Sequence, residues 1–340
     1  MCGLADESVP RREAEEGDVQ PETGVIRTVL GDIEPRELGR TNVHEHLLMR
    51  SPLLRGEELD DREKSSIEAA EMRRAGMDAL VELTPIGLGR DPEGVANIAE
   101  GSGLHIVLAT GIHREAHYLP EHWIHRTGPD QLTELFVRDI VEGCDGADYG
   151  GPQERPTTVR AGTIKVGAGY WCISTIERRV FEAAGRAHRR TGASVVCHLE
   201  LGSAAWEVLE ALRDAGVPPN RLALAHVDRN PDPGLHAELA AAGAYLGYDG
   251  MSRAKYWPDS VVLECLLEVA SRGGADRLLM GSDLARRSAF RSYGGMPGLE
   301  YLPRRFIPRL IEAGGESLVH RILDVNPARL LTLGFDKAAT

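Results

Sequence analysis

The stretch TNVHEHLL, from Thr41 to Leu48, places two histidines one residue apart at the end of an apolar run typical of a β-strand. In a strand, successive side chains point to opposite faces, so His44 and His46 project the same way and Glu45 points away. Two imidazoles on one face suit two ligands of one metal ion. The motif is weak by itself, so its meaning depends on what the other strands present.

Seven further runs of the same kind follow along the chain, and helical patterns separate them. They are DALVELTP, HIVLATGIH, RAGTIKVG, ASVVCHLE, LALAHVD, AYLGYDG and RLLMGSD, beginning near Asp78, His105, Arg160, Ala193, Leu222, Ala244 and Arg277. Strands that alternate with helices indicate a parallel sheet, and nearly continuous apolar strands indicate burial on both faces. We therefore expect an α/β protein, a single (β/α)8 barrel over residues 24–340.

Several helix ends are recognisable. Ser174 and Glu177 have the spacing of a capping box before IERRVFEAAGRAHRR, which Gly192 should end. Ser203 should open AAWEVLEALRDAG in the same manner, and Pro258 to Ser260 should open VVLECLLEVASRGG.

Composition excludes several classes of protein. With 340 residues, 42% of them hydrophobic, the chain can fill a large core. A formal charge of -13 argues against a nucleic-acid surface or recruitment to anionic membranes. Five cysteines without CxxC spacing favour a reducing compartment, so we expect a cytoplasmic protein. Residues 1–23 should form a disordered acidic tail, and no signal peptide or membrane span is indicated.

The connection from Ile112 to Val159 is unusually long for a barrel. It carries His113, His117, His122 and His125, with Tyr118 and Trp123 among them, before a helical LTELFVRDIVEG. Such loops usually shape a substrate pocket. Two interpretations of its histidines stay open, namely packing beside the aromatic rings and a further metal site.

Polar residues of metal-binding type end five of the strands, where barrel enzymes place their sites. They are His44, His46, Lys165, His198, His226 and Asp283. Four imidazoles and one carboxylate exceed the needs of one tetrahedral zinc, so a pair of metal ions is the simplest account. A charged Lys165 would be repelled by two cations. It either pairs with a carboxylate such as Asp283, or adds carbon dioxide to become an anionic carbamate that bridges both metals.

The order of these motifs resembles the phosphotriesterase family of the amidohydrolase superfamily. The resemblance rests on VHEHL, GTIKVG, VCHLE, LAHVD, GSD and the closing NPARLL, and GVIRTVLGDIEPRELGR resembles the family's amino-terminal hairpin. It implies two divalent ions, zinc in the first place, with manganese, cobalt or iron as alternatives. His44, His46 and Asp283 would bind the buried ion and His198 and His226 the more exposed one. Carboxylated Lys165 and a hydroxide would bridge them, and Asp283 would accept the proton of the nucleophile.

Substrate preference should depend on the loops after the seventh and eighth strands, GYDGMSRAKYWPD and SDLARRSAFRSYGG. Their cationic residues suit a phosphate or carboxylate group. The pattern resembles the branch that hydrolyses phosphorylated sugar lactones, whose phosphate-binding positions match Lys255 and Arg286. That branch has a tyrosine three residues after the arginine, where this chain has Ala289, with Tyr293 beyond. We take Lys255, Arg286, Arg287 and Tyr293 as candidate substrate contacts.

The leading hypothesis is thus a metal-dependent hydrolase, a lactonase acting on a small lactone with an anionic group. Hydrolysis of an N-acyl amide with an acidic tail and promiscuous phosphotriester hydrolysis use the same chemistry and stay open. A metal-binding scaffold that has lost catalysis is the non-enzymatic alternative. The resemblance also implies a possible homodimer.

Overall fold

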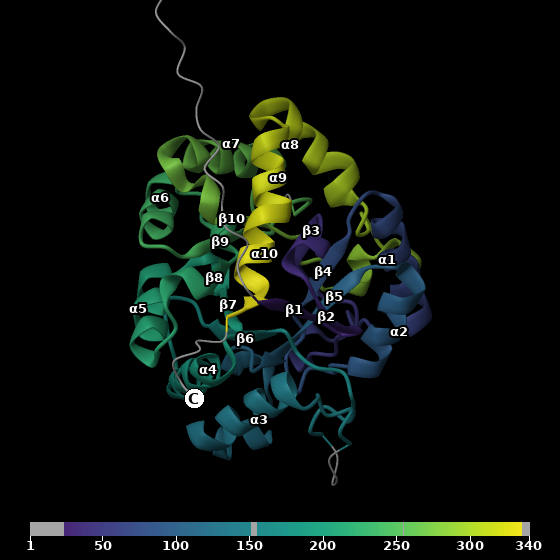
Figure 1. Cartoon of the computed structure of the whole chain (residues 1–340), viewed down its shortest axis with the longest axis vertical. Helices are drawn as coiled ribbons and strands as arrows, with labels where there is room; N and C mark the ends of the chain where they lie inside the picture. The colour runs from purple at the N-terminus through teal and green to yellow at the C-terminus, as the bar shows by residue number, and fades with distance from the viewer. Residues whose placement is uncertain (1–23, 151–154, 254, 335–340) are drawn as a thin grey trace, which may run out of the picture.

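A computed structural model describes residues 24–150, 155–253 and 255–334, and the predicted tail lies outside these ranges. Eight parallel strands form the centre of the molecule (Figure 1). They are β3 Thr41–Glu45, β4 Ala79–Glu82, β5 His105–Gly111, β6 Thr163–Ala168, β7 Ser194–Leu199, β8 Leu222–Ala225, β9 Tyr245–Tyr248 and β10 Leu278–Met280. Each coincides with one of the eight predicted runs, which confirms the barrel.

The strands pair in chain order from β3 to β10, and every pair is parallel. The two end strands approach each other through the residues that follow β10. The backbone N–H groups of Ser282 and Asp283 donate to the carbonyl oxygen of His44 at 3.1 and 2.9 Å. The sheet is therefore a nearly closed barrel, and this contact draws the end of β10 against β3.

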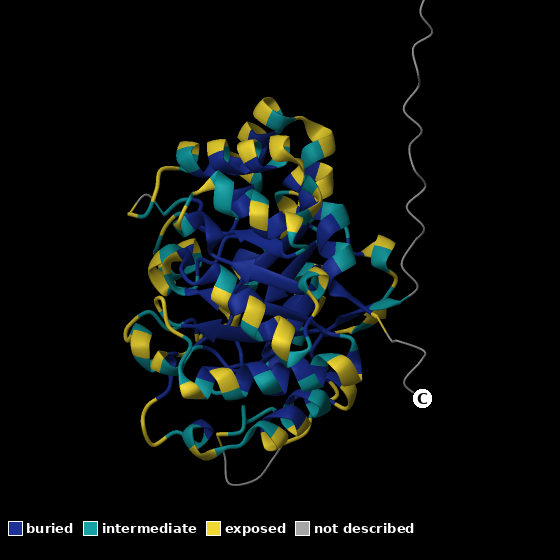
Figure 2. Ribbon diagram, turned by 90° about the vertical axis from the view of Figure 1, so that its left-hand side faces the viewer, coloured by how far each residue is buried: buried dark blue, intermediate teal, exposed yellow. Residues whose placement is uncertain are grey.

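Helices surround the strands, and their exposed residues lie along the outside (Figure 2). They are α1 Arg62–Arg74, α2 Pro92–Ser102, α3 Pro129–Val141, α4 Thr175–Thr191, α5 Ala205–Ala215, α6 Pro233–Ala241, α7 Asp259–Val269, α8 Ile307–Gly314, α9 Glu316–His320 and α10 Asn326–Leu331. None of the helices in the described ranges is long and apolar enough to cross a membrane.

A small antiparallel sheet lies beside the barrel, and it contains the amino-terminal hairpin predicted from the sequence. It consists of β1 Val25–Thr28, β2 Gly31–Ile33 and the short β11 Thr332–Leu333, which pairs with β1. Leu330 and Leu331 of α10 pack in one buried cluster with Ile26 and the inward-facing strand residues. The hairpin and the last helix therefore contribute to the barrel's apolar core.

The helix caps agree with the sequence in two cases and differ in one. Ser174 and Glu177 form the predicted capping box, and Gly192 ends α4 with a φ of +70°. Helix α7 begins at Asp259, as predicted. The prediction that Ser203 caps α5 was wrong, because Ala204 occupies the N-cap with a φ of +56°. The Ser203 hydroxyl instead donates to the carbonyl of Glu200 and accepts from the N–H of Trp171, which ties two loops together.

Candidate metal centre

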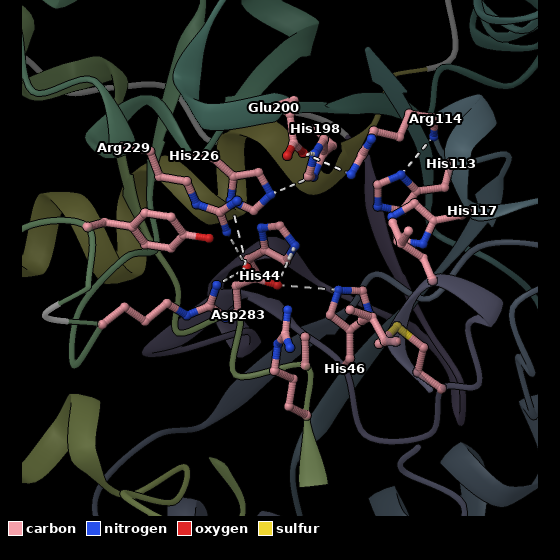
Figure 3. Close-up of a pocket in the computed structure, with 17 residues that line it drawn as sticks. His44, His46, His113, Arg114, His117, His198, Glu200, His226, Arg229 and Asp283 are labelled. Carbon is pink, nitrogen blue, oxygen red and sulfur yellow. Dashed lines mark hydrogen bonds and ion pairs between the residues drawn. The ribbon is translucent and has the colours of Figure 1, made fainter. Parts of the chain in front are cut away.

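A cavity of about 310 Å³ opens at the carboxyl ends of the strands (Figure 3). Five of the six predicted metal-site residues line it, all except Lys165. The remaining lining comes from loops that follow β3, β5, β7, β8, β9 and β10. Those residues are Met49, Leu53, Leu54, His113, Arg114, His117, Glu200, Arg229, Arg253, Tyr256, Ala285 and Arg286.

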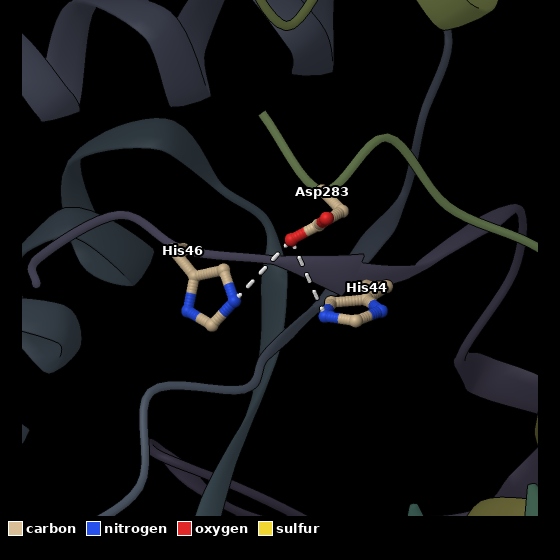
Figure 4. Close-up of side chains that lie close together, drawn as sticks. All are labelled: His44, His46 and Asp283. Atoms are coloured by element: carbon tan, nitrogen blue, oxygen red, sulfur yellow. Dashed lines mark ion pairs between the residues drawn. The ribbon is translucent and has the colours of Figure 1, made fainter. Parts of the chain in front are cut away.

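The first cluster in this cavity consists of His44, His46 and Asp283 (Figure 4). Nε2 of each histidine lies 3.5 Å from Oδ1 of Asp283. Asp283 follows β10 with a φ of +45°, a conformation that few residues other than glycine adopt. The contact between its backbone N–H and His44 holds it there, and this places the carboxylate between the two imidazoles.

The second cluster consists of His44, His226 and Asp249. Asp249 accepts hydrogen bonds from Nδ1 of His44 at 2.8 Å and from Nδ1 of His226 at 2.6 Å. One carboxylate therefore orients two candidate ligands through their outward nitrogens. Asp249 was missed in the sequence, although it ends the seventh strand run, AYLGYDG, as the other candidates end theirs.

The remaining two histidines are oriented in the same way. Nδ1 of His46 is hydrogen-bonded to the Thr84 hydroxyl at 2.8 Å, and Nε2 of His198 donates to Glu200 at 2.9 Å. His226 donates its ring N–H to Asp249, and His198 donates its ring N–H to Glu200. The second nitrogen of each neutral ring therefore carries a lone pair, and these two nitrogens, Nε2 of His226 and Nδ1 of His198, lie 2.8 Å apart. A cation shared by both nitrogens would relieve this repulsion. The donor set thus fits a metal ion.

Burial favours the uncharged form of His44, His198 and His226. It lowers the pKa of His44 to about 4 and that of His226 to about 3, and it holds the pKa of His198 well below its usual range. Burial alone would raise the pKa of Asp283, but Arg253, His44 and His226 hold that pKa well below its ordinary value. Neutral imidazoles beside an ionised carboxylate are the forms that metal ions bind.

Lys165 lies in β6, fully buried, with Nζ 3.4 Å from Nε2 of His44. Burial lowers the pKa of its amine to about 8. No ion pair joins Lys165 to Asp283 in the described part of the chain, so the simple pairing considered from the sequence is not formed. The structure brings Lys165 to the same centre as the four histidines.

The arginines of the cavity differ in their partners. Arg229 and Arg253 pair with Oδ2 of Asp283 at 2.7 and 2.9 Å, and Arg114 pairs with Glu200 at 3.1 Å. Arg286 lines the cavity, and its guanidinium forms no ion pair with the residues that the structure describes. Arg229 was missed in the sequence, although it follows His226 by three residues.

The other three predicted substrate contacts lie outside the cavity lining. Lys255 is exposed, with its ammonium 4.8 Å from the centre of the Tyr256 ring. Arg287 is exposed over Tyr293. The Tyr293 hydroxyl is hydrogen-bonded to the backbone of Asp61 at the start of α1, at 2.9 Å.

The histidines of the long connection have different surroundings, and only the packing interpretation made from the sequence has support. His122 packs beside Tyr118 and Trp123, as expected for a structural role. His113 and His117 instead line the cavity, stacked with their ring centres 4.0 Å apart. Neither belongs to a group of three metal-binding side chains among the described residues.

Comparison with known proteins agrees with this geometry. The sequence profile of the phosphotriesterase family matches residues 24–331. This chain belongs to the phosphotriesterase family. As a member of the family it is a metal-dependent hydrolase with two His/Asp clusters able to hold metal ions.

Three proteins similar to this chain are named for the hydrolysis of small molecules. A phospho-furanose lactonase of Mycoplasmopsis synoviae is 30% identical over 91% of this chain and 92% of its own length. The structure of a lactonase from Listeria monocytogenes, 32% identical, superposes with a TM-score of 0.83 over 92% of this chain and all of that one. An N-acetyltaurine hydrolase of Danio rerio is 27% identical over 91% of this chain and 98% of its length.

Proposed function

We propose that this protein is a lactonase whose small-molecule substrate carries an anionic group, a phosphate or a carboxylate. The supporting observation is the set of arginines beside the candidate metal residues of a chain with a formal charge of -13. Arg229 and Arg253 are engaged by Asp283, whereas Arg286 is unpaired among the described residues. Arg286 is therefore the cation available to bind the anion of a substrate. The phospho-furanose lactonases among the relatives support this choice.

We further propose that His44, His46 and Asp283 hold one divalent ion and His198 and His226 a second, with Lys165 joining both as a carbamate. Zinc suits this nitrogen and oxygen donor set, as do manganese, cobalt and iron. Two bound ions would supply Lewis acidity, which lowers the pKa of water and polarises the oxygen of the scissile group.

The side chains then have separate roles in opening the lactone. Asp283 is ionised, and it accepts the proton that the attacking water loses and passes that proton to the ring oxygen as the acyl carbon–oxygen bond breaks. Arg229 and Arg253 hold its Oδ2, so Oδ1 stays on the side of His44 and His46. The pKa of Asp283, held well below its ordinary value, keeps the carboxylate ionised at neutral pH.

Paired lactones with and without a phosphate test the proposal. We expect higher kcat/KM for the phosphorylated member. Arg286→Ala should raise KM for that substrate roughly tenfold or more and leave the plain lactone nearly unchanged, because a charge-assisted hydrogen bond is lost. Arg291→Ala, at an exposed position of the same loop where the guanidinium pairs with Glu300, is the matched control. Equal activity on both lactones would remove the anionic group from the proposal.

Amide hydrolysis is the second candidate, because the N-acetyltaurine hydrolases are similar over nearly the whole chain. Release of amine from N-acyl amino acids and N-acyl taurines, without lactone opening, would favour it. A preference for neutral phosphotriesters would instead favour the promiscuous activity. Cytoplasmic localisation, homodimerisation and the contacts of Lys255, Arg287 and Tyr293 stay predictions from the sequence.

A further inference from the structure

His113 is a cavity residue outside the six-residue centre. It follows β5 on the long connection, and its ring centre lies 4.6 Å from that of His198. His113 and His117 lie on the opposite side of the cavity from Arg229 and His226 (Figure 3). A substrate held between these walls would contact the imidazole of His113.

The backbone decides which nitrogen of His113 carries the proton. The N–H of Arg114 donates to Nδ1 of His113 at 2.7 Å. Because a backbone N–H can only donate, Nδ1 must be the acceptor, and the proton of the ring lies on Nε2. No residue in the described ranges is hydrogen-bonded to that Nε2. The ring therefore offers a donor to the cavity.

Neighbouring residues fix the orientation of this donor. The ring of His117 stacks on His113 at an interplanar angle of 28°, and its Nδ1 is hydrogen-bonded to the Ser51 hydroxyl at 2.8 Å. On the other side, a Cβ at Gly167 would lie 2.9 Å from the backbone nitrogen of Arg114 and 3.2 Å from Nδ1 of His113. Glycine in β6 thus allows the close approach that holds the loop and its imidazole in place. A donor held in this way needs no reorganisation to bind a ligand.

We infer that His113 is a substrate-contacting residue whose Nε2–H donates a hydrogen bond to an oxygen of the substrate. His113 makes this contact from the side of the cavity formed by the connection after β5. This inference rests on the proposed function and deepens it. The substrate must present a hydroxyl or carbonyl oxygen to His113 in addition to the anionic group held by Arg286. His113 binds and does not transfer a proton, because a neutral imidazole that gave up its proton would become an anion.

Three variants test the inference on the substrate that the wild-type protein hydrolyses fastest among lactones and N-acyl amides. His113→Phe keeps a ring for the stack but has no donor, and we expect kcat/KM to fall about tenfold or more while two metal ions stay bound. His113→Gln restores an N–H donor and should recover part of the loss. His122→Phe, on the same connection but outside the cavity, should retain wild-type kcat/KM. Wild-type kcat/KM in His113→Phe, or equal loss in the Phe and Gln variants, would overturn the inference.

A second measurement does not depend on the proposed function. The method is NMR of zinc-loaded protein labelled with 15N-histidine, in which the ring signals that disappear in His113→Gln are assigned to His113. These signals should show the Nε2–H tautomer at neutral pH. The Nδ1–H tautomer would overturn the inference. A wild-type protein that hydrolyses only amides would refute the lactonase proposal and leave the test of His113 intact.

Discussion

Lys165 is chemically the most unusual residue of the candidate centre. Its amine is buried beside the imidazole of His44 and near Asp283, and burial favours its uncharged form. An uncharged amine can add carbon dioxide, and the resulting carbamate carries two oxygen donors. A residue that supplies a positive charge at this place would oppose metal binding.

We expect Lys165→Ala to lose both metal ions and hydrolytic activity, because the joining ligand is removed. Short carboxylic acids that enter the vacated space should restore part of the activity. Metal content by mass spectrometry and rates with and without propionate measure these effects. Unchanged metal content in the variant would refute the bridging role.

Asp249 illustrates how a residue outside the proposed ligand set can control it. Its two oxygens accept from His44 on β3 and from His226 directly after β8, which are far apart in the sequence. We expect Asp249→Asn to weaken metal binding about 10- to 100-fold, because an amide accepts through one atom only and the second imidazole loses its orientation. Competition with a chelator measures the affinity. Asp276→Asn, at an exposed ion pair with Arg321, is the control, and equal affinity in both variants would contradict this role.

At the scale of elements, the sequence predicts a helix or strand correctly where residues close together in the chain determine it. The eight strands are continuous apolar runs, and α4 is closed by Ser174 and Gly192, which act on their own helix. Ser203 fails as a cap because two loops compete for its hydroxyl. The same limit applies to the long connection, where neighbouring histidines acquired different surroundings only after folding.

Ser174→Ala should lower the free energy of unfolding by about 1 kcal/mol, because the N–H of Glu177 loses its acceptor at the start of α4. Urea unfolding followed by circular dichroism measures this change. Ser260→Ala, in the first turn of α7 where Pro258 is the N-cap, should have little effect. Equal destabilisation by the two substitutions would argue against the capping box.

At the scale of the whole molecule, barrel closure joins residues from opposite ends of the chain. Asn42 and Ser282 are hydrogen-bonded at 3.2 Å across a separation of 240 residues. This closure places Asp283 beside His44 of β3 and beside His46, which follows that strand. Folding also buries histidines where protonation is unfavourable, which makes the stability of the fold depend on pH.

His236 lies outside the candidate metal centre, so the pH dependence of stability can be tested there without changing a metal-site residue. It is buried against the Tyr248 hydroxyl at 2.7 Å, and burial lowers its pKa to about 4. In the unfolded chain the imidazole of His236 binds a proton near pH 6.5, whereas in the folded protein it does so only near pH 4. The neutral ring therefore makes its full contribution to the stability of the fold above pH 6.5, and that contribution is lost as the pH falls towards 4. Between pH 7.5 and pH 5 the loss from this group is about 2 kcal/mol. In His236→Gln the pH-dependent loss, measured by urea unfolding at both pH values, should be smaller by that amount. An unchanged difference would contradict the assignment.

The sequence by itself determined the barrel and the candidate ligand set. Each strand is a local apolar run, and in a parallel barrel the strand ends meet at one face, so six polar residues at those ends were expected to converge. Only the tertiary structure decided which nitrogen of each histidine faces the cavity and that Asp249, Glu200 and Thr84 hold the other nitrogens. It also decided that Arg286 lines the cavity when Lys255 does not. These features depend on contacts between side chains of different strands and loops. Sequence spacing does not encode such contacts, because closure and loop packing set their distances.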